Sequence, residues 1–205
     1  MNWIDFKSRM FDLGCFSVNQ VYAWQPGFDR NAFGRWVRKG YLVRLRQGFY
    51  AFPEYQGKPD MAVYFAARIY NPSYVSLHTA LAFYGLIPEA VTQITSVTSL
   101  KTALFKNGFG EYSYKSVRED LMFGYAPQPL ADSRAIPYAT REKALLDLLY
   151  LYPFYNTATE LADLRLDPDA LHEEVSRSGL EADAARFRCA ALERRLRLLM
   201  KVYGL

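Results

Sequence analysis

The hydrophobic positions that follow Asp29 repeat with the period of an α-helix. Phe33, Trp36 and Val37 fall on one face of such a helix, which predicts that this face is buried. The opposite face carries a polar stripe of three side chains, Asn31, Arg35 and Arg38. Asp29 is favourable at the start of a helix and Gly40 just past its end, so a helix is predicted between them.

The period changes to two after this helix, which predicts β-structure. Hydrophobic residues alternate with Arg44 and Arg46 over residues 43–46, so both arginines would lie on one face of a strand. Gln47-Gly48 can form a two-residue turn that leads into a returning strand over residues 49–52. The side chains expected on the apolar side of this hairpin are Val43, Leu45, Tyr50 and Phe52.

Two further helices are predicted upstream of this stretch. The first would bury one face and end at Gly14; the face consists of Trp3, Phe6, Met10 and Leu13. The second would begin at Ser17, which forms a capping box with Gln20, bury Val18, Val21 and Tyr22, and end at the turn over residues 25–27. Helix, helix, turn, helix and hairpin is the order of a winged helix-turn-helix, in which the third helix enters the DNA major groove.

The turn-rich segment over residues 54–59 separates this part from the rest of the chain. It is too short to be a free linker, so we expect the two parts to touch. We predict a winged helix-turn-helix DNA-binding domain over residues 1–58 and an α+β domain over residues 59–205. The fold class of the whole chain is therefore predicted to be α+β.

The second part shows helical patterns on both sides of a β-rich segment. Four helices are predicted to start at the capping residues Asp60, Ser76, Thr140 and Asp167. A fifth and longest helix is predicted from Leu180 onward. Strands are predicted over residues 93–99, 112–117, 121–125 and 135–138. Helices, a small sheet and more helices in this order are typical of an α+β domain.

Charge is distributed unevenly along the chain of 205 residues, which has a net charge of +4. Residues 1–60 hold nine basic and five acidic side chains, whereas residues 61–205 hold sixteen of each. The positive excess therefore lies entirely in the first part, as expected for a small nucleic-acid-binding module joined to a neutral domain.

The cysteines and the first residues indicate where the protein acts. Cys15 and Cys189 are far apart and form neither a disulfide framework nor a zinc-binding spacing. A signal peptide needs an apolar run near its start, where this chain has the charged residues Asp5, Lys7 and Arg9. Its apolar runs are also too short to span a membrane. We expect a cytoplasmic protein with no membrane partner.

Few residues suggest catalysis. His78 follows a predicted helix cap and is interpreted as a structural residue, and His172 lies among acidic residues on a solvated helix face. Glu142, Lys143 and Asp147 lie beside an apolar helix face. Glu142 and Lys143 can serve the helix start, and Asp147 can pair locally. The sequence contains no metal-ligand spacing, phosphate-binding glycine loop or nucleophile elbow. We predict that the protein is not an enzyme and requires no cofactor.

Four segments occur in an order that resembles one family. They are RKGYLVRLRQGFYAF, YVSLHTALAFYGLIPE, ITSVTS and ATREKALLDLLYLYP. Together they resemble the AbiEi antitoxins, transcriptional regulators of type IV toxin–antitoxin systems that are linked to abortive infection and phage defence. The resemblance covers most of the chain from Phe16 to Pro153.

This resemblance implies a function for each part of the chain. The winged helix would bind inverted repeats of double-stranded DNA in the protein's own promoter and repress the operon. The second domain would counter a nucleotidyltransferase-like toxin encoded next door, without forming a stable complex. The implied DNA-binding residues are Arg30, Asn31, Arg35, Arg38 and Lys39 in the helix and Arg44, Arg46 and Gln47 in the wing. Of these, we expect the helix arginines to reach base edges and the wing arginines to meet phosphate.

Other functions remain open at this point. The protein could be a stand-alone winged-helix regulator without a toxin partner, or a winged-helix module that binds other proteins. A nucleic-acid enzyme is disfavoured because the sequence offers no set of catalytic ligands or nucleophiles. Salt-dependent binding to duplex DNA would separate a DNA-binding protein from a protein-binding one.

Overall fold

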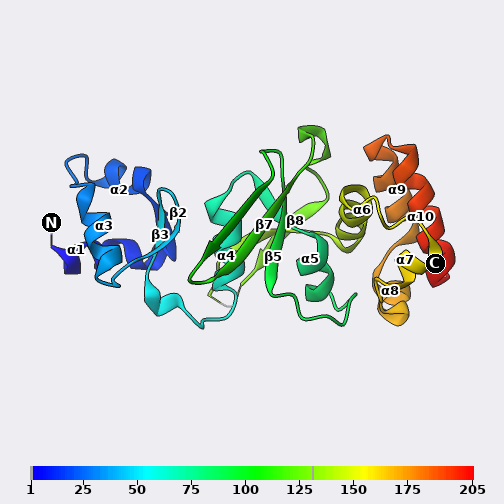
Figure 1. The fold of residues 1–205 in the computed structure, drawn as a ribbon, viewed down its shortest axis with the longest axis horizontal. Helices are drawn as coiled ribbons and strands as arrows, with labels where there is room; N and C mark the ends of the chain where they lie inside the picture. Colours follow the sequence, from blue (N-terminus) through cyan, green and yellow to red (C-terminus); the bar gives the residue numbers. More distant parts are fainter. Residues whose placement is uncertain (1, 131) are drawn as a thin grey trace.

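The computed structural model describes residues 2–130 and 132–205. The chain is elongated and has three parts that follow one another along its longest axis (Figure 1). Helices and a small sheet form the N-terminal end, a larger sheet with two helices occupies the middle, and helices alone form the C-terminal end. The described residues therefore form a mixed α+β fold with two sheets, which confirms the predicted fold class.

The N-terminal unit, which we define as residues 3–55, follows the predicted order of helices and hairpin. Its helices are α1 (Trp3–Met10), α2 (Val18–Trp24) and α3 (Asn31–Arg38), with short 3-10 helices η1 (Phe11–Leu13) and η2 (Pro53–Tyr55). Its strands are β1 (Cys15–Ser17), β2 (Val43–Arg46) and β3 (Phe49–Ala51), which form an antiparallel sheet in the order β1-β3-β2. The sequence pattern missed β1, because the residues that precede a helix cap carry no periodic signal of their own.

Aromatic packing holds this unit together. The Phe6 ring lies 4.6 Å from that of Trp36, and the Phe33 ring stacks on that of Tyr50 at 4.9 Å, so α1, α3 and β3 share one core. The predicted capping box of α2 is present. Leu13 was expected on the buried face of the first helix but is 39% exposed. That prediction was wrong because the helix tightens into η1 after Met10, which turns Leu13 away from the core.

The hairpin differs from its prediction at one point. The Gln47-Gly48 turn is present, but the register shifts between Arg44 and Arg46, so Arg44 lies opposite Tyr50 and Arg46 lies opposite the adjacent residue Phe49. Neighbouring residues of a strand point to opposite faces of the sheet. The bulge therefore places the two arginines on opposite faces, and the prediction that they share one face was wrong.

The middle of the molecule is built on a six-stranded mixed sheet within the described residues. Its order is β6-β7-β5-β4-β9-β8, and the β4–β9 and β5–β7 pairs are parallel. The strands are β4 (Ser73–Val75), β5 (Gln93–Thr98), β6 (Ala103–Asn107), β7 (Gly110–Ser116), β8 (Tyr125–Pro129) and β9 (Ala135–Ala139). The helices of this part are α4 (Met61–Ile69) and α5 (Leu77–Phe83).

Three of the four predicted strands are present with shifted ends. The strand predicted over residues 121–125 was wrong: residues 119–121 form the 3-10 helix η3 (Glu119–Leu121), and β8 starts only at Tyr125. Strand β8 contains Pro127 and Pro129, and proline cannot donate a hydrogen bond to a neighbouring strand. Proline is tolerated there because β8 lies at the edge of the sheet.

The C-terminal end is helical. It consists of α6 (Arg141–Leu151), α7 (Ala158–Ala162), α8 (Pro168–Glu174), α9 (Arg177–Phe187) and α10 (Ala190–Tyr203). Thr140 and Asp167 cap α6 and α8 through their side chains, as predicted. The long helix predicted from Leu180 is instead two helices, because the backbone at Arg188 adopts a left-handed conformation with φ of 50° and ends α9.

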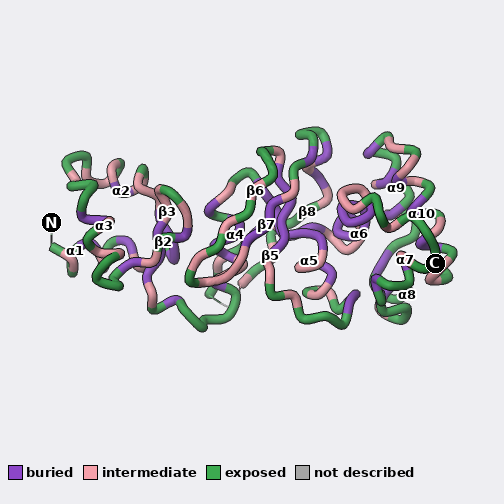
Figure 2. The backbone as a smooth tube through the Cα atoms, in the orientation of Figure 1, coloured by how far each residue is buried: buried purple, intermediate pink, exposed green. Residues whose placement is uncertain are grey.

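Helix α6 is buried on most sides (Figure 2), and its charged residues Lys143 and Asp147 are among the buried ones. Asp147 pairs locally, as predicted; its partner is Lys143, and both side chains are 0% exposed. Asp147 Oδ2 accepts hydrogen bonds from the hydroxyls of Tyr74, at 2.9 Å, and Ser76, at 2.8 Å. Ser76 therefore does not cap α5 through its side chain, contrary to prediction, because its hydroxyl is bonded to α6. The predicted side-chain cap at Asp60 is also absent from the described contacts.

Candidate nucleic-acid interface

An open groove of about 970 Å³ lies in the N-terminal unit between α2, α3 and the β2–β3 hairpin. Six of the DNA-binding residues predicted from the sequence line this groove: Arg30, Asn31, Arg35, Arg38, Arg44 and Gln47. The rest of its lining consists of Val18, Asn19, Tyr22, Phe33, Gly34, Gly48 and Tyr50. No acidic side chain is among the described residues of this lining, so the groove presents concentrated positive charge.

Helix α3 orients its polar residues toward this groove because its opposite face packs on the core. Phe33 is 2% exposed, and Trp36 and Val37 pack against the same hydrophobic cluster. With that face buried, Asn31, Arg35 and Arg38 are exposed, as the helical pattern predicted. The groove therefore combines one wall from the helix with another from the hairpin.

Asp29 stands beside the start of α3 and constrains Arg35. Its Oδ1 accepts a hydrogen bond from the Asn31 backbone N–H at 2.9 Å, and its Oδ2 forms an ion pair with Arg35 Nη2 at 2.8 Å. The Asn31 N–H, and then the Arg35 guanidinium, hold the pKa of the Asp29 carboxyl below its usual range. The first helical turn starts one residue later than predicted, with Arg30 at the N-cap position.

Lys39 and Arg46 are outside the described lining of the groove. Lys39 is exposed just past α3, with its ammonium 6.0 Å from the centre of the Tyr41 ring. Arg46 lies on the other face of the hairpin, where its guanidinium faces the Phe49 ring at 5.0 Å. The structure thus gathers most of the predicted DNA-binding residues and separates these two from them.

Sequence reasoning missed the contribution of α2. Asn19 and Tyr22 both line the groove, although Tyr22 was expected to face inward. The two residues are three positions apart, so they share a face of α2 next to the one that carries the buried Val21. The only signal in the sequence was their helical spacing, which places Asn19 and Tyr22 on one face of α2.

Replacing Asp29 with asparagine should strengthen binding of the full chain to duplex DNA by roughly two- to fivefold at low salt. The amide keeps an acceptor for the Asn31 N–H but releases Arg35 and removes a negative charge from the rim of the groove. Fluorescence anisotropy with a labelled duplex measures the change, and Asp5→Asn, an exposed acid on α1, is the control. Weaker binding by Asp29→Asn would mean that Arg35 depends on this carboxylate for its orientation.

The histidines and acidic residues outside the groove are candidates for a second kind of site. Among residues 2–130 and 132–205, no three His, Cys, Asp or Glu side chains come together in a way that could hold a metal ion. Burial lowers the pKa of His78, whose ring lies 5.7 Å from that of Tyr152, and His172 is exposed on α8. Within the same described ranges, no helix is long and apolar enough to cross a membrane.

The N-terminal unit combines helices, a small antiparallel sheet and a groove lined with arginines. These features make it a candidate nucleic-acid-binding domain. Residues 8–53 match the family described as "Transcriptional regulator, AbiEi antitoxin". The matched segment contains every residue that lines the groove. No curated protein matches the chain. The resemblance inferred from the sequence is therefore confirmed over the segment that builds the groove.

Proposed function

We propose that this protein is a winged helix-turn-helix transcriptional repressor whose α3 enters the major groove of DNA. The β2–β3 hairpin would be the wing. One observation carries this proposal: arginines from α3 and its N-cap, Arg30, Arg35 and Arg38, line the same groove as Arg44 of the hairpin. An α-helix flanked by a basic hairpin matches the width of the major groove and the phosphates beside it.

The placement of the side chains suggests different roles for helix and hairpin. Arg35 and Arg38 project from the exposed face of α3 with Asn31, so we assign them to base edges. Arg44 and Gln47 lie on the hairpin side of the groove and would contact the DNA backbone. Lys39 is exposed beyond the end of α3, where it could reach a phosphate adjacent to the groove.

The family match supports a wider proposal for the whole chain. We propose that residues 1–58 bind inverted repeats in the protein's own promoter, and that residues 59–205 neutralise a toxin. The toxin would be a nucleotidyltransferase-like protein that forms no stable complex with this chain. The chain would act in the cytoplasm as an antitoxin in phage defence, without catalysing a reaction of its own.

The full chain should bind duplex DNA with a strong dependence on salt. With about five phosphate contacts, the logarithm of the affinity should fall against the logarithm of salt concentration with a slope of roughly −4 to −5. Arg44→Ala should make this slope shallower by about one, because one phosphate contact is lost. Fluorescence anisotropy titrations at several salt concentrations measure both quantities.

Arg118→Ala provides the matched control, since Arg118 is an exposed arginine far from the groove residues in sequence and paired with Asp120. It should leave the slope unchanged. A flat salt response of the wild-type chain would refute DNA binding and favour a module that binds other proteins.

A further inference from the structure

The bulge in β2 is held by a residue from the central sheet. Leu45 has no partner in the described β2–β3 register, and its carbonyl oxygen accepts a hydrogen bond from Asn107 Nδ2 at 2.9 Å. Asn107 Oδ1 in turn accepts a hydrogen bond from the Phe109 backbone N–H at 2.8 Å. The amide of Asn107 is therefore fixed within its own turn while it satisfies the carbonyl that the bulge releases.

The β6–β7 turn that carries Asn107 also packs closely on the hairpin. A Cβ atom at Gly108 would lie only 3.3 Å from Val43 Cγ1, so the turn leaves little room for a side chain against Val43 of β2. On the other side, Gln56 Nε2 donates a hydrogen bond to the Gly108 carbonyl at 3.1 Å. The turn thus contacts both β2 and the segment that follows the hairpin.

Arg46 forms a second contact between the hairpin and the central part. Its guanidinium lies 5.4 Å from the centre of the Tyr70 ring and 5.6 Å from that of Phe105 on β6, in addition to Phe49 on its own hairpin. Its Nε is buried and has no hydrogen-bond partner among the described residues. A guanidinium placed among aromatic rings in this way contributes stacking and cation–π attraction to the interface.

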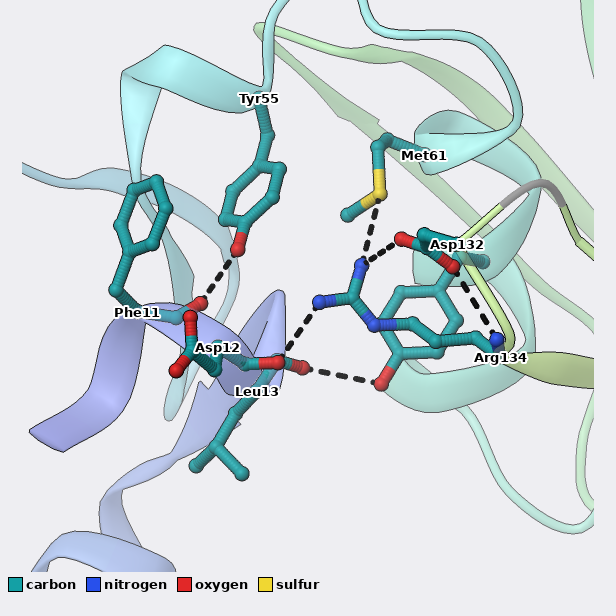
Figure 3. Close-up of polar contacts among 8 residues, drawn as sticks. Phe11, Asp12, Leu13, Tyr55, Met61, Asp132 and Arg134 are labelled. Carbon is teal, nitrogen blue, oxygen red and sulfur yellow. Dashed lines mark hydrogen bonds and ion pairs between the residues drawn. The ribbon is translucent and has the colours of Figure 1, made fainter.

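The helical side of the N-terminal unit is anchored separately (Figure 3). Arg134 Nη2 donates to the Asp12 carbonyl at 2.8 Å, and Tyr64 donates from its hydroxyl to the Leu13 carbonyl at 3.0 Å. A Cβ at Gly14 would lie 2.9 Å from the Tyr64 ring, so the surfaces meet without a gap. The η1 segment and the hairpin are therefore each attached to the central part through their own contacts.

We propose that Asn107 and Arg46 are positioning residues for DNA binding, which hold the hairpin at a set angle to α3. Arg44 and Gln47 share that hairpin, so its orientation decides whether they line the same groove as Arg38. The role in DNA binding rests on the proposed function. Arg46 then acts through the contacts of Arg44 and not through a phosphate of its own.

The test uses the full chain and a labelled duplex of mixed sequence. Asn107→Ala should weaken binding by roughly three- to tenfold, the effect of one lost hydrogen bond that orients a charged contact. Leu104→Ala on the same strand, where the side chain is 66% exposed, should bind as the wild type does. Asn107 carries no charge and lies outside the described groove lining, so a direct electrostatic effect cannot produce this loss.

A double-mutant cycle shows how the two residues act. Arg46→Gln and Asn107→Ala should each weaken binding in the wild-type background and cause little further loss in an Arg44→Ala background. The proposal would be overturned if Arg46→Gln caused an equal loss of affinity in both backgrounds and a salt slope shallower by about one. That result would identify Arg46 as an independent phosphate contact.

Hydrogen exchange without DNA separates this inference from the proposed function. Amides of residues 43–51 should exchange faster in Asn107→Ala than in the wild type, while those of α3 keep their protection. Unchanged exchange in the hairpin would overturn the positioning role even if the wild-type chain binds DNA. A third outcome is that the wild-type chain does not bind DNA, while the hairpin amides still exchange faster in Asn107→Ala. This result would refute the proposed function and the DNA-binding part of this inference, but Asn107 would still stabilise the hairpin.

Discussion

Replacing Lys143 with methionine should lower the free energy of unfolding by about 3–5 kcal/mol, the usual cost of removing one partner from a buried ion pair. Lys143 and Asp147 are both fully buried on α6. Methionine fills a similar volume but leaves the Asp147 carboxylate without its opposite charge. The energy is lost mainly because this charge, once unpaired, remains out of contact with water.

The surroundings of the pair explain why few other groups can compensate. The Lys143 ammonium lies 4.7 Å from the ring centres of Phe123 and Phe187 and 5.4 Å from that of Tyr74. Burial lowers the pKa of Lys143 and, in the opposite direction, raises that of Asp147. Each charge is thus maintained by the other, and the pair connects α6 to Tyr74 and Ser76.

Urea denaturation followed by circular dichroism measures the effect of Lys143→Met. Lys101→Met is the control, because Lys101 is exposed and its replacement should change stability by less than about 0.5 kcal/mol. A loss below about 1 kcal/mol for Lys143→Met would contradict the prediction and indicate that Asp147 is neutral in the folded chain.

If the chain acts as proposed, replacing Arg35 and Arg38 together with alanine should abolish repression of its promoter while leaving toxin neutralisation intact. Each bidentate base contact contributes about 1–3 kcal/mol, so losing both should weaken operator binding by roughly thirtyfold or more. Arg35→Ala also leaves the Asp29 carboxylate unpaired at the groove, where it repels phosphate. Both arginines are exposed, so the fold should survive.

A promoter reporter and co-expression of the proposed nucleotidyltransferase-like toxin test both proposed functions in the same cells. Arg9→Ala combined with Lys58→Ala, which removes two exposed basic residues outside the described groove lining and outside residues 59–205, controls for the change in net charge. Circular dichroism establishes that each variant is folded. Loss of protection in the folded Arg35 and Arg38 variant would show that neutralisation depends on DNA binding, contrary to the separation of the two functions.

Local patterns in the sequence were sufficient to predict the wall of the groove that α3 forms. The periodicity of Phe33, Trp36 and Val37 predicted which face of α3 is buried, and the exposure of Arg35 and Arg38 follows from it. The caps of α2 and α6 were equally predictable, because a capping side chain bonds backbone groups only a few residues away. The family of residues 8–53 was also recognised from motifs in the sequence.

The features that the sequence did not predict depend on contacts between residues that are distant in sequence. Asn107 bonds the carbonyl of Leu45 across 62 positions, at the bulge that places Arg46 outside the described groove lining. Alternation along β2 could not reveal a bulge, since a bulge changes strand pairing and leaves the order of residues untouched. Strand β8, with its prolines, exists because β9 offers it an edge to pair with.

The sequence by itself determined the local elements whose stabilising contacts lie within one or two helical turns, and with them the basic face of α3. Only the tertiary structure decided that Lys143 and Asp147 are buried and that the hairpin arginines are separated. Burial and strand register depend on the surfaces that fold over a segment, and those surfaces come from residues far along the chain.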